Sequence, residues 1–222
     1  MNFLFCGYRD WSETVFSHMK RKFNSDIFFS ATSRNQLREY RRSNIKFDLI
    51  FFVGWSWIID ENFLFKNKCI CIHPSPLPKY RGGSPIQHQI ISGEKESRIS
   101  AFLMTAELDA GPILSSSENF SLEGDLSDIF ERISHHSIKC LSNIIERFKS
   151  DELSLSHQQE GESSIFKRRK PSQSEISLDD FSTYSAREIY DKIRCLQNPY
   201  PNAFIVCGDG NKLYLTGAHI DD

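Results

Sequence analysis

Residues 69–83 restrict the fold of this chain more than any other stretch, because a strand pattern runs directly into a proline-rich loop. They read Cys-Ile-Cys-Ile-His-Pro-Ser-Pro-Leu-Pro-Lys-Tyr-Arg-Gly-Gly. The alternation predicts that Cys69, Cys71 and His73 share one face of a strand. Pro74 ends that strand, since it has no N–H to donate to a ladder. Open α/β sheets bind their ligands at such strand ends, beside a stiff loop.

The first 150 residues alternate between strand and helix patterns. Apolar runs predict strands at residues 2–6, 26–31, 47–54, 68–73, 98–105 and 112–117. Helical spacing predicts helices at residues 10–23, 35–43, 84–91 and 125–150. The turn at residues 7–10 has neither a G-x-G-x-x-G nor a Walker pattern, so we expect no dinucleotide or P-loop site. The expected class is α/β, a Rossmann-like, mostly parallel sheet with helices on both faces, plus a small C-terminal α+β module.

Composition narrows the function classes. A formal charge of −2 argues against a general nucleic-acid binder. No apolar run approaches the ~20 residues of a membrane span, and the first residues show no signal-peptide pattern. Six cysteines without a repeating spacing indicate reduced thiols in a cytoplasmic protein.

Two motifs resemble one enzyme family. Residues 73–82, His-Pro-Ser-Pro-Leu-Pro-Lys-Tyr-Arg-Gly, resemble the H-x-S-L-L-P-x-[YF]-x-G segment of the folate-dependent formyltransferases. Residues 108–113, Leu-Asp-Ala-Gly-Pro-Ile, are similar to the D-[TA]-G pattern of the same family. The resemblance implies formyl transfer from 10-formyltetrahydrofolate as donor, with His73 and Asp109 as catalytic residues. An imidazole suits the proton steps of that reaction, because it titrates near neutrality.

One catalytic position departs from the family pattern. The family has an asparagine two residues before the histidine, and this chain has Cys71. A thiol is only a weak hydrogen-bond donor to an oxyanion. Three interpretations stay open: an active variant, which we favour and in which Cys71 is the third catalytic position; a slow or inactive relative that still binds ligand; and a metal site at Cys69, Cys71 and His73. Residues 69 and 73 of a flat strand lie about 13 Å apart, so we expect no metal.

The resemblance also implies ligand-binding positions. The folate would contact Trp57, Ile58, Ile59, Pro76, Leu77 and Leu108. The acceptor substrate would contact Arg9, Lys79, Tyr80 and Arg81, because arginine and lysine suit a phosphate or pyrophosphate. Two alternatives without a ligand contact remain: Arg9 could be a solvated surface arginine, and the tryptophans could only cover the sheet edge.

The pattern after residue 150 predicts a linker and a second module. Residues 151–165 are polar and rich in Ser, Glu and Gln, as in an exposed linker. Residues 166–222 would form a small module with a helix at 185–196 and a hairpin whose turn contains Asp209-Gly210. The basic run at residues 167–170 suits an anionic ligand, although a solvated turn is the default for four charges. The catalytic domain would then be residues 1–150.

The acceptor follows by exclusion within the family. The methionyl-tRNA enzymes have a longer, basic C-terminal domain, the glycinamide ribonucleotide enzymes have a glycine- and serine-rich phosphate loop, and the hydrolases have an added N-terminal domain. We therefore expect a nucleotide-linked 4-amino-4,6-dideoxysugar that is N-formylated for a surface polysaccharide. The expected partners are this sugar nucleotide and, in one arrangement, a second copy in a homodimer, with neither nucleic acid nor membrane. A binding relative with little turnover, or another small amine acceptor, remains the alternative.

Overall fold

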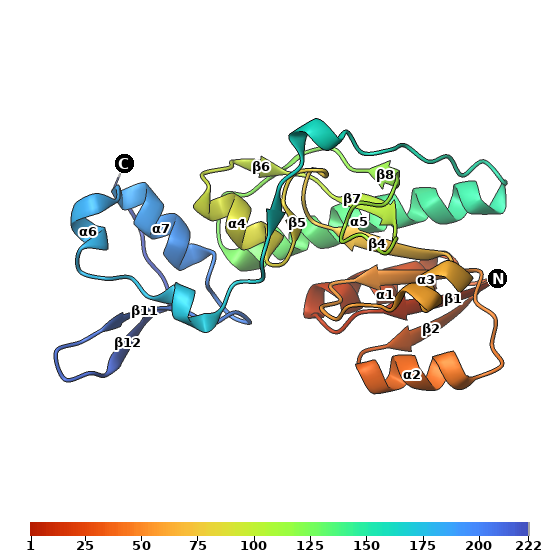
Figure 1. Ribbon diagram of the computed structural model, residues 1–222, viewed down its shortest axis with the longest axis horizontal. Coiled ribbons are helices and arrows are strands. Elements are labelled where there is room, and N and C mark those ends of the chain that lie inside the picture. The colour runs from red at the N-terminus through yellow and green to blue at the C-terminus, as the bar shows by residue number, and fades with distance from the viewer. Residues whose placement is uncertain (222) are drawn as a thin grey trace.

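A computed structural model describes residues 1–221 and is built on one six-stranded sheet (Figure 1). The sheet has the strand order β2-β1-β3-β4-β7-β8. Its strands are β1 (Asn2–Cys6), β2 (Ile27–Ala31), β3 (Leu49–Val53), β4 (Cys69–His73), β7 (Ser100–Leu103) and β8 (Ile113–Ser116). The first four pair in parallel, and β7 and β8 pair antiparallel at one edge. The predicted α/β class is confirmed.

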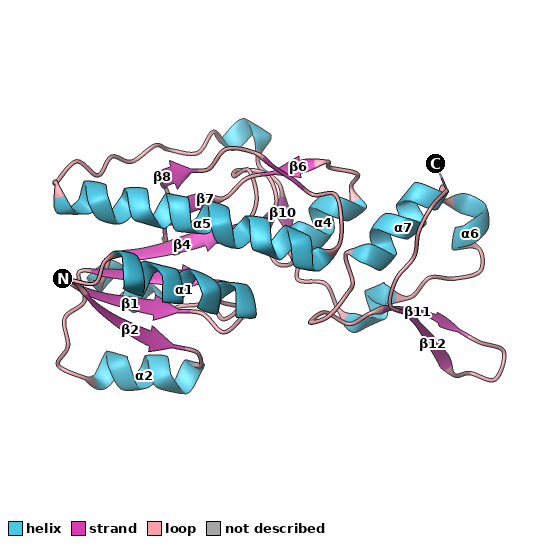
Figure 2. Ribbon diagram, turned by 180° about the vertical axis from the view of Figure 1, so that it is seen from behind, coloured by secondary structure: helices cyan, strands magenta, loops and turns pink. Residues whose placement is uncertain are grey.

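Helices cover both faces of the sheet, as the apolar patterns predict. One face packs against α1 (Asp10–Lys22) and α5 (Leu126–Lys149), which lie side by side in Figure 2. The other face packs against α2 (Arg34–Arg42) and α3 (Glu61–Lys66). All five residues of β3 are buried, which accounts for its unbroken apolar run. The helix α3 was not predicted, because its six residues are too few to show a period.

The strand that opens the proline-rich stretch has the predicted faces. Ile70 and Ile72 belong to the core beneath α1 and α5, while Cys69 and Cys71 pack toward α2 and α3. His73 is the last residue of β4, at the carboxyl end of the parallel strands. The helix α4 (Pro85–Ile91) follows, with proline in its first turn as expected. The sheet therefore delivers His73 to the edge where a ligand site was expected.

The C-terminal part contains α6 (Asp180–Thr183), α7 (Ala186–Arg194) and the hairpin of β11 (Ala203–Val206) and β12 (Lys212–Leu215). The helix and the hairpin lie where the sequence predicts them. Ile189 and Ile193 belong to the same core cluster as the sheet. Buried Arg194 donates to the carbonyls of Leu122 and Gly124, which precede α5. These contacts fix the C-terminal part against the N-terminal end of α5. The domain boundaries at residues 150 and 166 stay a prediction.

The segment predicted to be an exposed linker is mostly exposed, but it is bound to the first domain. We call residues 156–171 the crossing segment; it includes η1 (Glu160–Glu162) and β10 (Ile165–Phe166) and ends at the first residue of η2 (Pro171–Ser174). Ser156 exchanges both backbone hydrogen bonds with Ile113. The strand β10 pairs in parallel with β5 (Arg81–Gly82), which belongs to the proline-rich stretch. A polar composition does not reveal such pairing, because these bonds join backbone groups. Short strands β6 (Glu96–Ser97) and β9 (Phe120–Ser121) complete the elements.

No helix among residues 1–221 is both long and apolar enough to cross a membrane.

Candidate active site

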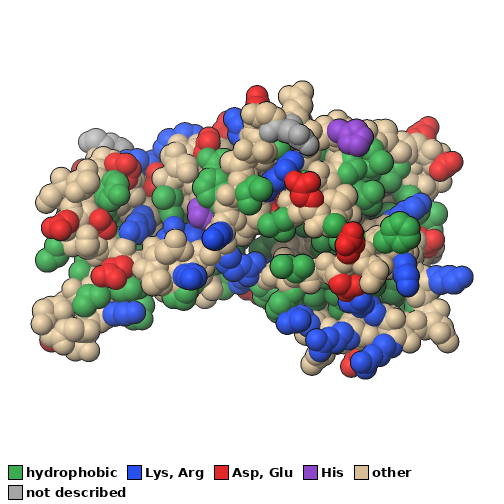
Figure 3. All heavy atoms as spheres, viewed as in Figure 1, with side chains coloured by type: hydrophobic (Ala, Val, Ile, Leu, Met, Phe, Trp, Pro, Cys, Tyr) green, Lys and Arg blue, Asp and Glu red, His purple; other side chains and the backbone are tan. Residues whose placement is uncertain are grey.

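A cavity of about 830 Å³ opens at the carboxyl ends of the parallel strands. It is lined by residues that follow β1 and β3, by the end of β4, by the start of α4 and by the crossing segment. It is also lined by Leu196, Pro199, Tyr200 and Pro201 of the C-terminal part. Figure 3 shows one face of the molecule, with Lys and Arg side chains beside the hollow at its centre. Ligands bind in this place in open α/β sheets, so the cavity is the candidate site.

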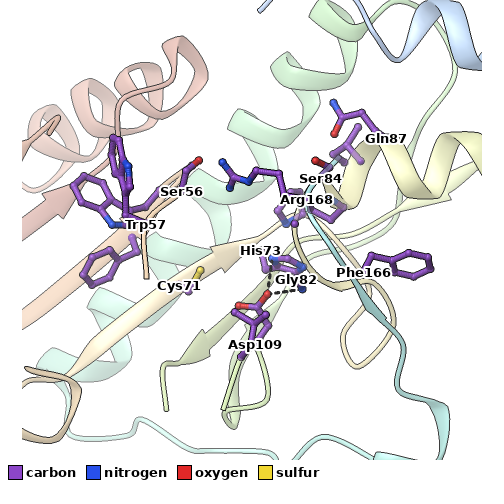
Figure 4. Close-up of a pocket in the computed structure, with 18 of the residues that line it drawn as sticks. Ser56, Trp57, Cys71, His73, Gly82, Ser84, Gln87, Asp109, Phe166 and Arg168 are labelled. Carbon is purple, nitrogen blue, oxygen red and sulfur yellow. Dashed lines mark hydrogen bonds and ion pairs between the residues drawn. The ribbon is translucent and has the colours of Figure 1, made fainter. Parts of the chain in front are cut away.

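His73 and Asp109 meet in this cavity (Figure 4). The Nδ1 atom of His73 lies 3.8 Å from Oδ2 of Asp109, and their side chains are 7% and 14% exposed. The same Oδ2 atom accepts a hydrogen bond of 2.8 Å from the backbone N–H of Gly82. Asp109 has a positive φ of 51°. A side chain held in a sparsely populated backbone conformation at a ligand site is typical of functional residues.

The surroundings of His73 determine which ring nitrogen is free to accept a proton. Its Nε2 atom lies 2.9 Å from the carbonyl oxygen of Tyr80, which can only accept a hydrogen bond. Nε2 therefore carries the proton in the neutral ring, and Nδ1 is unprotonated. Nδ1 faces the carboxylate, so protonation there would form an ion pair with Asp109. The imidazole can thus accept and return one proton without turning.

Buried hydrogen bonds shape the loop that follows His73. The hydroxyl of Ser100 donates to the carbonyl of Ser75 and accepts from the N–H of Leu77. The amide of Gln89 donates to the carbonyl of Pro74 and accepts from the hydroxyl of Ser97. These polar groups replace a regular ladder where the prolines cannot form one.

Comparisons with known proteins agree with this geometry. The sequence model described as formyl transferase matches residues 12–145, more than half of the chain. The chain belongs to the formyl transferase family. The methionyl-tRNA formyltransferase of Finegoldia magna is 31% identical over 166 residues, which are 73% of this chain and 52% of that protein. The corresponding protein of Campylobacter jejuni is 30% identical over 179 residues, 81% of this chain and 55% of its own length. The chain spans about half the length of these curated relatives.

Solved structures of formyltransferases share the fold. A structure described as methionyl-tRNA formyltransferase from Clostridium thermocellum has a TM-score of 0.82 at 30% identity, and the match covers 96% of both chains. A 4-N formyltransferase from Francisella tularensis has a TM-score of 0.77 at 18% identity, covering 100% of this chain and 98% of that one. At that lower identity the likeness shows the fold alone. Members of the family are folate-dependent N-formyltransferases that use 10-formyltetrahydrofolate.

Cys71, the position that departs from the formyl transferase motif, lines the cavity beside His73 and Asp109 (Figure 4). Burial raises the pKa of its thiol well above the usual value, and the charge of Asp109 raises it further. The thiol therefore stays protonated near neutral pH and can donate only weakly. Among the residues that the structure describes, no group of three His, Cys, Asp or Glu side chains is arranged to hold a metal ion.

The predicted folate-binding residues fall into two sets. Trp57, Ile58, Ile59 and Leu108 line the cavity, and Ile58 is 93% exposed at its mouth. Pro76 and Leu77 do not line it, and Leu77 is buried. Of the three prolines in this loop, Pro74 lines the cavity, whereas Pro76 and Pro78 do not. The expectation that residues 76 and 77 contact the folate is therefore not supported by their position.

Of the four predicted substrate-binding residues, only Arg9 lines the cavity. Tyr80 is buried, donates its hydroxyl to Glu94 and stacks its ring on Phe166. Arg81 is 5% exposed, and its guanidinium donates to Gln158. Lys79 is exposed and does not line the cavity either. None of Lys79, Tyr80 and Arg81 lines the cavity, so their position does not support the predicted contact with the acceptor.

The cavity contains residues that the sequence did not single out or left as a solvated turn. All four residues of the basic run at 167–170 line it, and Arg168 extends its side chain across the cavity in Figure 4. Tyr200 lines the opposite side, with the guanidinium of Arg9 5.2 Å from the centre of its ring. Burial raises the pKa of Tyr200, although the charges of Arg9 and Arg168 partly oppose this rise. Two arginines from distant parts of the chain thus act on one hydroxyl.

Proposed function

We propose that this chain transfers the formyl group of 10-formyltetrahydrofolate to the amino group of a nucleotide-linked amino-dideoxysugar. The observation that carries the reaction is the pairing of His73 with Asp109 inside the cavity of a formyl transferase. An N-formylated sugar of this kind would serve surface polysaccharide synthesis.

The lining of the cavity fits a folate donor. Aromatic and aliphatic side chains follow β3, and Ile58 leaves its apolar surface almost wholly uncovered at the mouth. The indole N–H of Trp55 is buried and has no hydrogen-bond partner among the described residues. A flat ring with polar edges would cover the apolar surface and supply an acceptor. The donor, when bound, supplies the formyl group on a nitrogen leaving group.

The catalytic pair supplies the proton steps. When the amine of the acceptor forms the new C–N bond to the formyl carbon, it must lose one proton. Nδ1 of His73 accepts that proton, and the carboxylate of Asp109 stabilises the resulting imidazolium. The same nitrogen returns the proton to the departing folate nitrogen as the old C–N bond breaks. One imidazole therefore serves as base and then acid, and no net proton is gained or lost.

Cationic side chains support an acceptor with phosphate groups. Arg9, Lys167, Arg168 and Lys170 line the cavity, and none of them forms an ion pair with a carboxylate among the side chains that the structure describes. Arginine binds phosphate oxygens through paired N–H groups, and cations left without a partner beside a cavity suit an anionic ligand. A nucleoside diphosphate linked to the sugar would place its pyrophosphate here and its amine toward His73.

The test measures N-formylated product by mass spectrometry with a panel of amino-sugar nucleotides. Arg168→Gln is expected to raise KM for the sugar nucleotide about 10- to 100-fold, the effect of losing a charged hydrogen bond, with KM for the folate unchanged. Arg38→Gln removes the same charge from the exposed surface of α2 and should leave both constants unchanged. Folate binding without formylation of any amine would instead favour a binding relative.

Methionyl-tRNA is the second candidate acceptor, because the curated relatives cited above carry that name. Including charged initiator tRNA in the panel separates the two. Product from the tRNA and none from the sugar nucleotides would overturn the proposed acceptor while keeping the reaction.

A further inference from the structure

The amide side chain of Gln158 joins three backbone segments around the catalytic pair. Its oxygen accepts hydrogen bonds from Arg81, at 3.1 Å from Nε and 2.7 Å from Nη2. Its nitrogen donates to the carbonyl of Asp109 at 2.9 Å and to the carbonyl of Gly111 at 2.8 Å. A guanidinium can only donate and a carbonyl can only accept, so the orientation of the amide is unambiguous. One side chain from the crossing segment thus makes four hydrogen bonds.

Both ends of the Gln158 amide bind groups that lie next to the Asp109 carboxylate in the chain or donate to it through a neighbour. Arg81 is adjacent to Gly82, whose N–H donates to the carboxylate of Asp109. The carbonyls of Asp109 and Gly111 belong to the loop that carries that carboxylate. The positive φ of Asp109 is costly for a residue with a side chain, so the loop keeps it only if outside contacts fix its carbonyls. Gln158 provides such contacts.

We propose that Gln158 is a positioning residue, which holds the Asp109 carboxylate in register with His73 and with the N–H of Gly82. It touches neither reactant, since it does not line the cavity. The inference rests on the proposed function for its effect on rate, but the placement of Asp109 can be measured without turnover. A displacement of about 1 Å in a catalytic group lowers rates by about 100-fold.

Three variants separate positioning from general stability. Gln158→Glu keeps an acceptor for Arg81, and adds an ion pair to it, but faces two carbonyls with a carboxylate that cannot donate. Gln158→Met keeps the length of the side chain and removes both kinds of bond. Gln159→Glu makes the same charge change at the exposed neighbouring residue and is the matched control.

The direct readout is the amide proton of Gly82 in a ¹H–¹⁵N spectrum, because its hydrogen bond to the Asp109 carboxylate moves it downfield. In Gln158→Glu and Gln158→Met we expect this proton to move upfield, as in Asp109→Ala, and in Gln159→Glu we expect no change. An unchanged Gly82 resonance in a folded Gln158→Glu protein would overturn the inference.

The kinetic readout is the division between kcat and KM. Gln158→Glu should lower kcat about 10- to 100-fold and leave KM for the folate within about twofold, because the lining of the cavity is untouched. Wild-type kcat in a Gln158→Glu protein would refute the role in catalysis. Wild-type protein that formylates no amine would refute the proposed function instead, and the Gly82 resonance would still decide whether Gln158 positions Asp109.

Discussion

Substitution of Gly82 tests whether the crossing segment is built into the active site. Gly82 has φ +96°, and a Cβ there would lie 2.2 Å from the carbonyl oxygen of Phe166. Gly93 has a similar φ of +81°, but a Cβ there meets nothing within 4 Å. Alanine at either position has the same backbone strain, while only alanine at 82 must push β10 away. The pair therefore separates strain from the contact between segments.

The expected magnitudes follow from the bonds that the contact supports. Positive φ costs an alanine about 1–2 kcal/mol, which is the whole effect expected for Gly93→Ala. The Gly82→Ala change would also break two hydrogen bonds, one from Gly83 N–H to the Phe166 carbonyl and one from Gly82 N–H to the Asp109 carboxylate. They add about 1 kcal/mol for the neutral bond and about 2 kcal/mol for the charged one. Gly82→Ala should thus cost about 3 kcal/mol more than Gly93→Ala.

Thermal unfolding followed by circular dichroism measures this difference. At about 2–4 °C per kcal/mol for a chain of this size, Tm of Gly82→Ala should lie about 6–12 °C below that of Gly93→Ala. Urea midpoints provide the same comparison at one temperature. Equal losses in the two variants would mean that β10 does not press on β5, and would refute the reasoning that attaches residues 156–171 to the site.

Two further predictions concern the catalytic side chains. His73→Ala and Asp109→Asn should each lower kcat by about 10²–10⁴-fold, the range of general acid–base catalysis. Cys71→Ala should keep part of the activity, because a thiol is a weak donor. A Cys71→Ala enzyme as impaired as His73→Ala would show that the thiol is essential. Iodoacetamide at about pH 8 should label exposed Cys207 well before Cys71, whose pKa is raised by burial and by Asp109, as peptide mass spectrometry would measure. Equal labelling rates would contradict the raised pKa of the Cys71 thiol.

The sequence was sufficient for the sheet and for singling out His73 and Asp109, which meet in the cavity, because the strands and the two motifs leave local signals. The catalytic role of the two side chains stays a prediction. Apolar runs identify the buried strands, and alternation places Cys71 and His73 correctly on β4. His73 and Asp109 each lie in a motif, and the structure brings them together although Asp109 lies in the loop between the antiparallel strands β7 and β8. Their meeting across 36 residues was expected from the resemblance to the formyltransferases, because the strand pattern alone does not determine the path of the loop between β7 and β8.

The sequence was not sufficient for the direction of side chains after the prolines. Tyr80 and Arg81 are next to a catalytic motif and have the chemistry of phosphate ligands, yet both are buried behind the loop. Their direction depends on pairing with Ile165 and Phe166, which lie more than 80 residues later. A two-residue strand has no period to detect, so no local pattern announces this pairing.

The same absence of pattern hides the side of the cavity where we propose that the acceptor binds. Gln158 and Arg168 lie in polar, charged sequence that is typical of a solvated linker, and their roles come from where the backbone crosses. Arg168 lines the cavity only because the crossing segment runs past Gly83. The charge of such residues predicts which kind of ligand they could bind, but it does not predict whether their side chains line a binding site.

Residues 69–83 nevertheless contain one sign that the crossing segment passes beside them. A Cβ on Gly83 would lie 2.5 Å from Cα of Arg168, just as one on Gly82 would meet the carbonyl of Phe166. Two consecutive glycines after a stiff loop are thus explained by another backbone at contact distance, and a strand glycine indicates such an approach in general. The glycines predict that some segment passes there, while only the folded chain identifies it as residues 166–168. A Gly83→Ala variant should therefore disturb the cavity from the side of Arg168, raising KM for an anionic acceptor more than KM for the folate, and equal effects on both would contradict this division of the cavity.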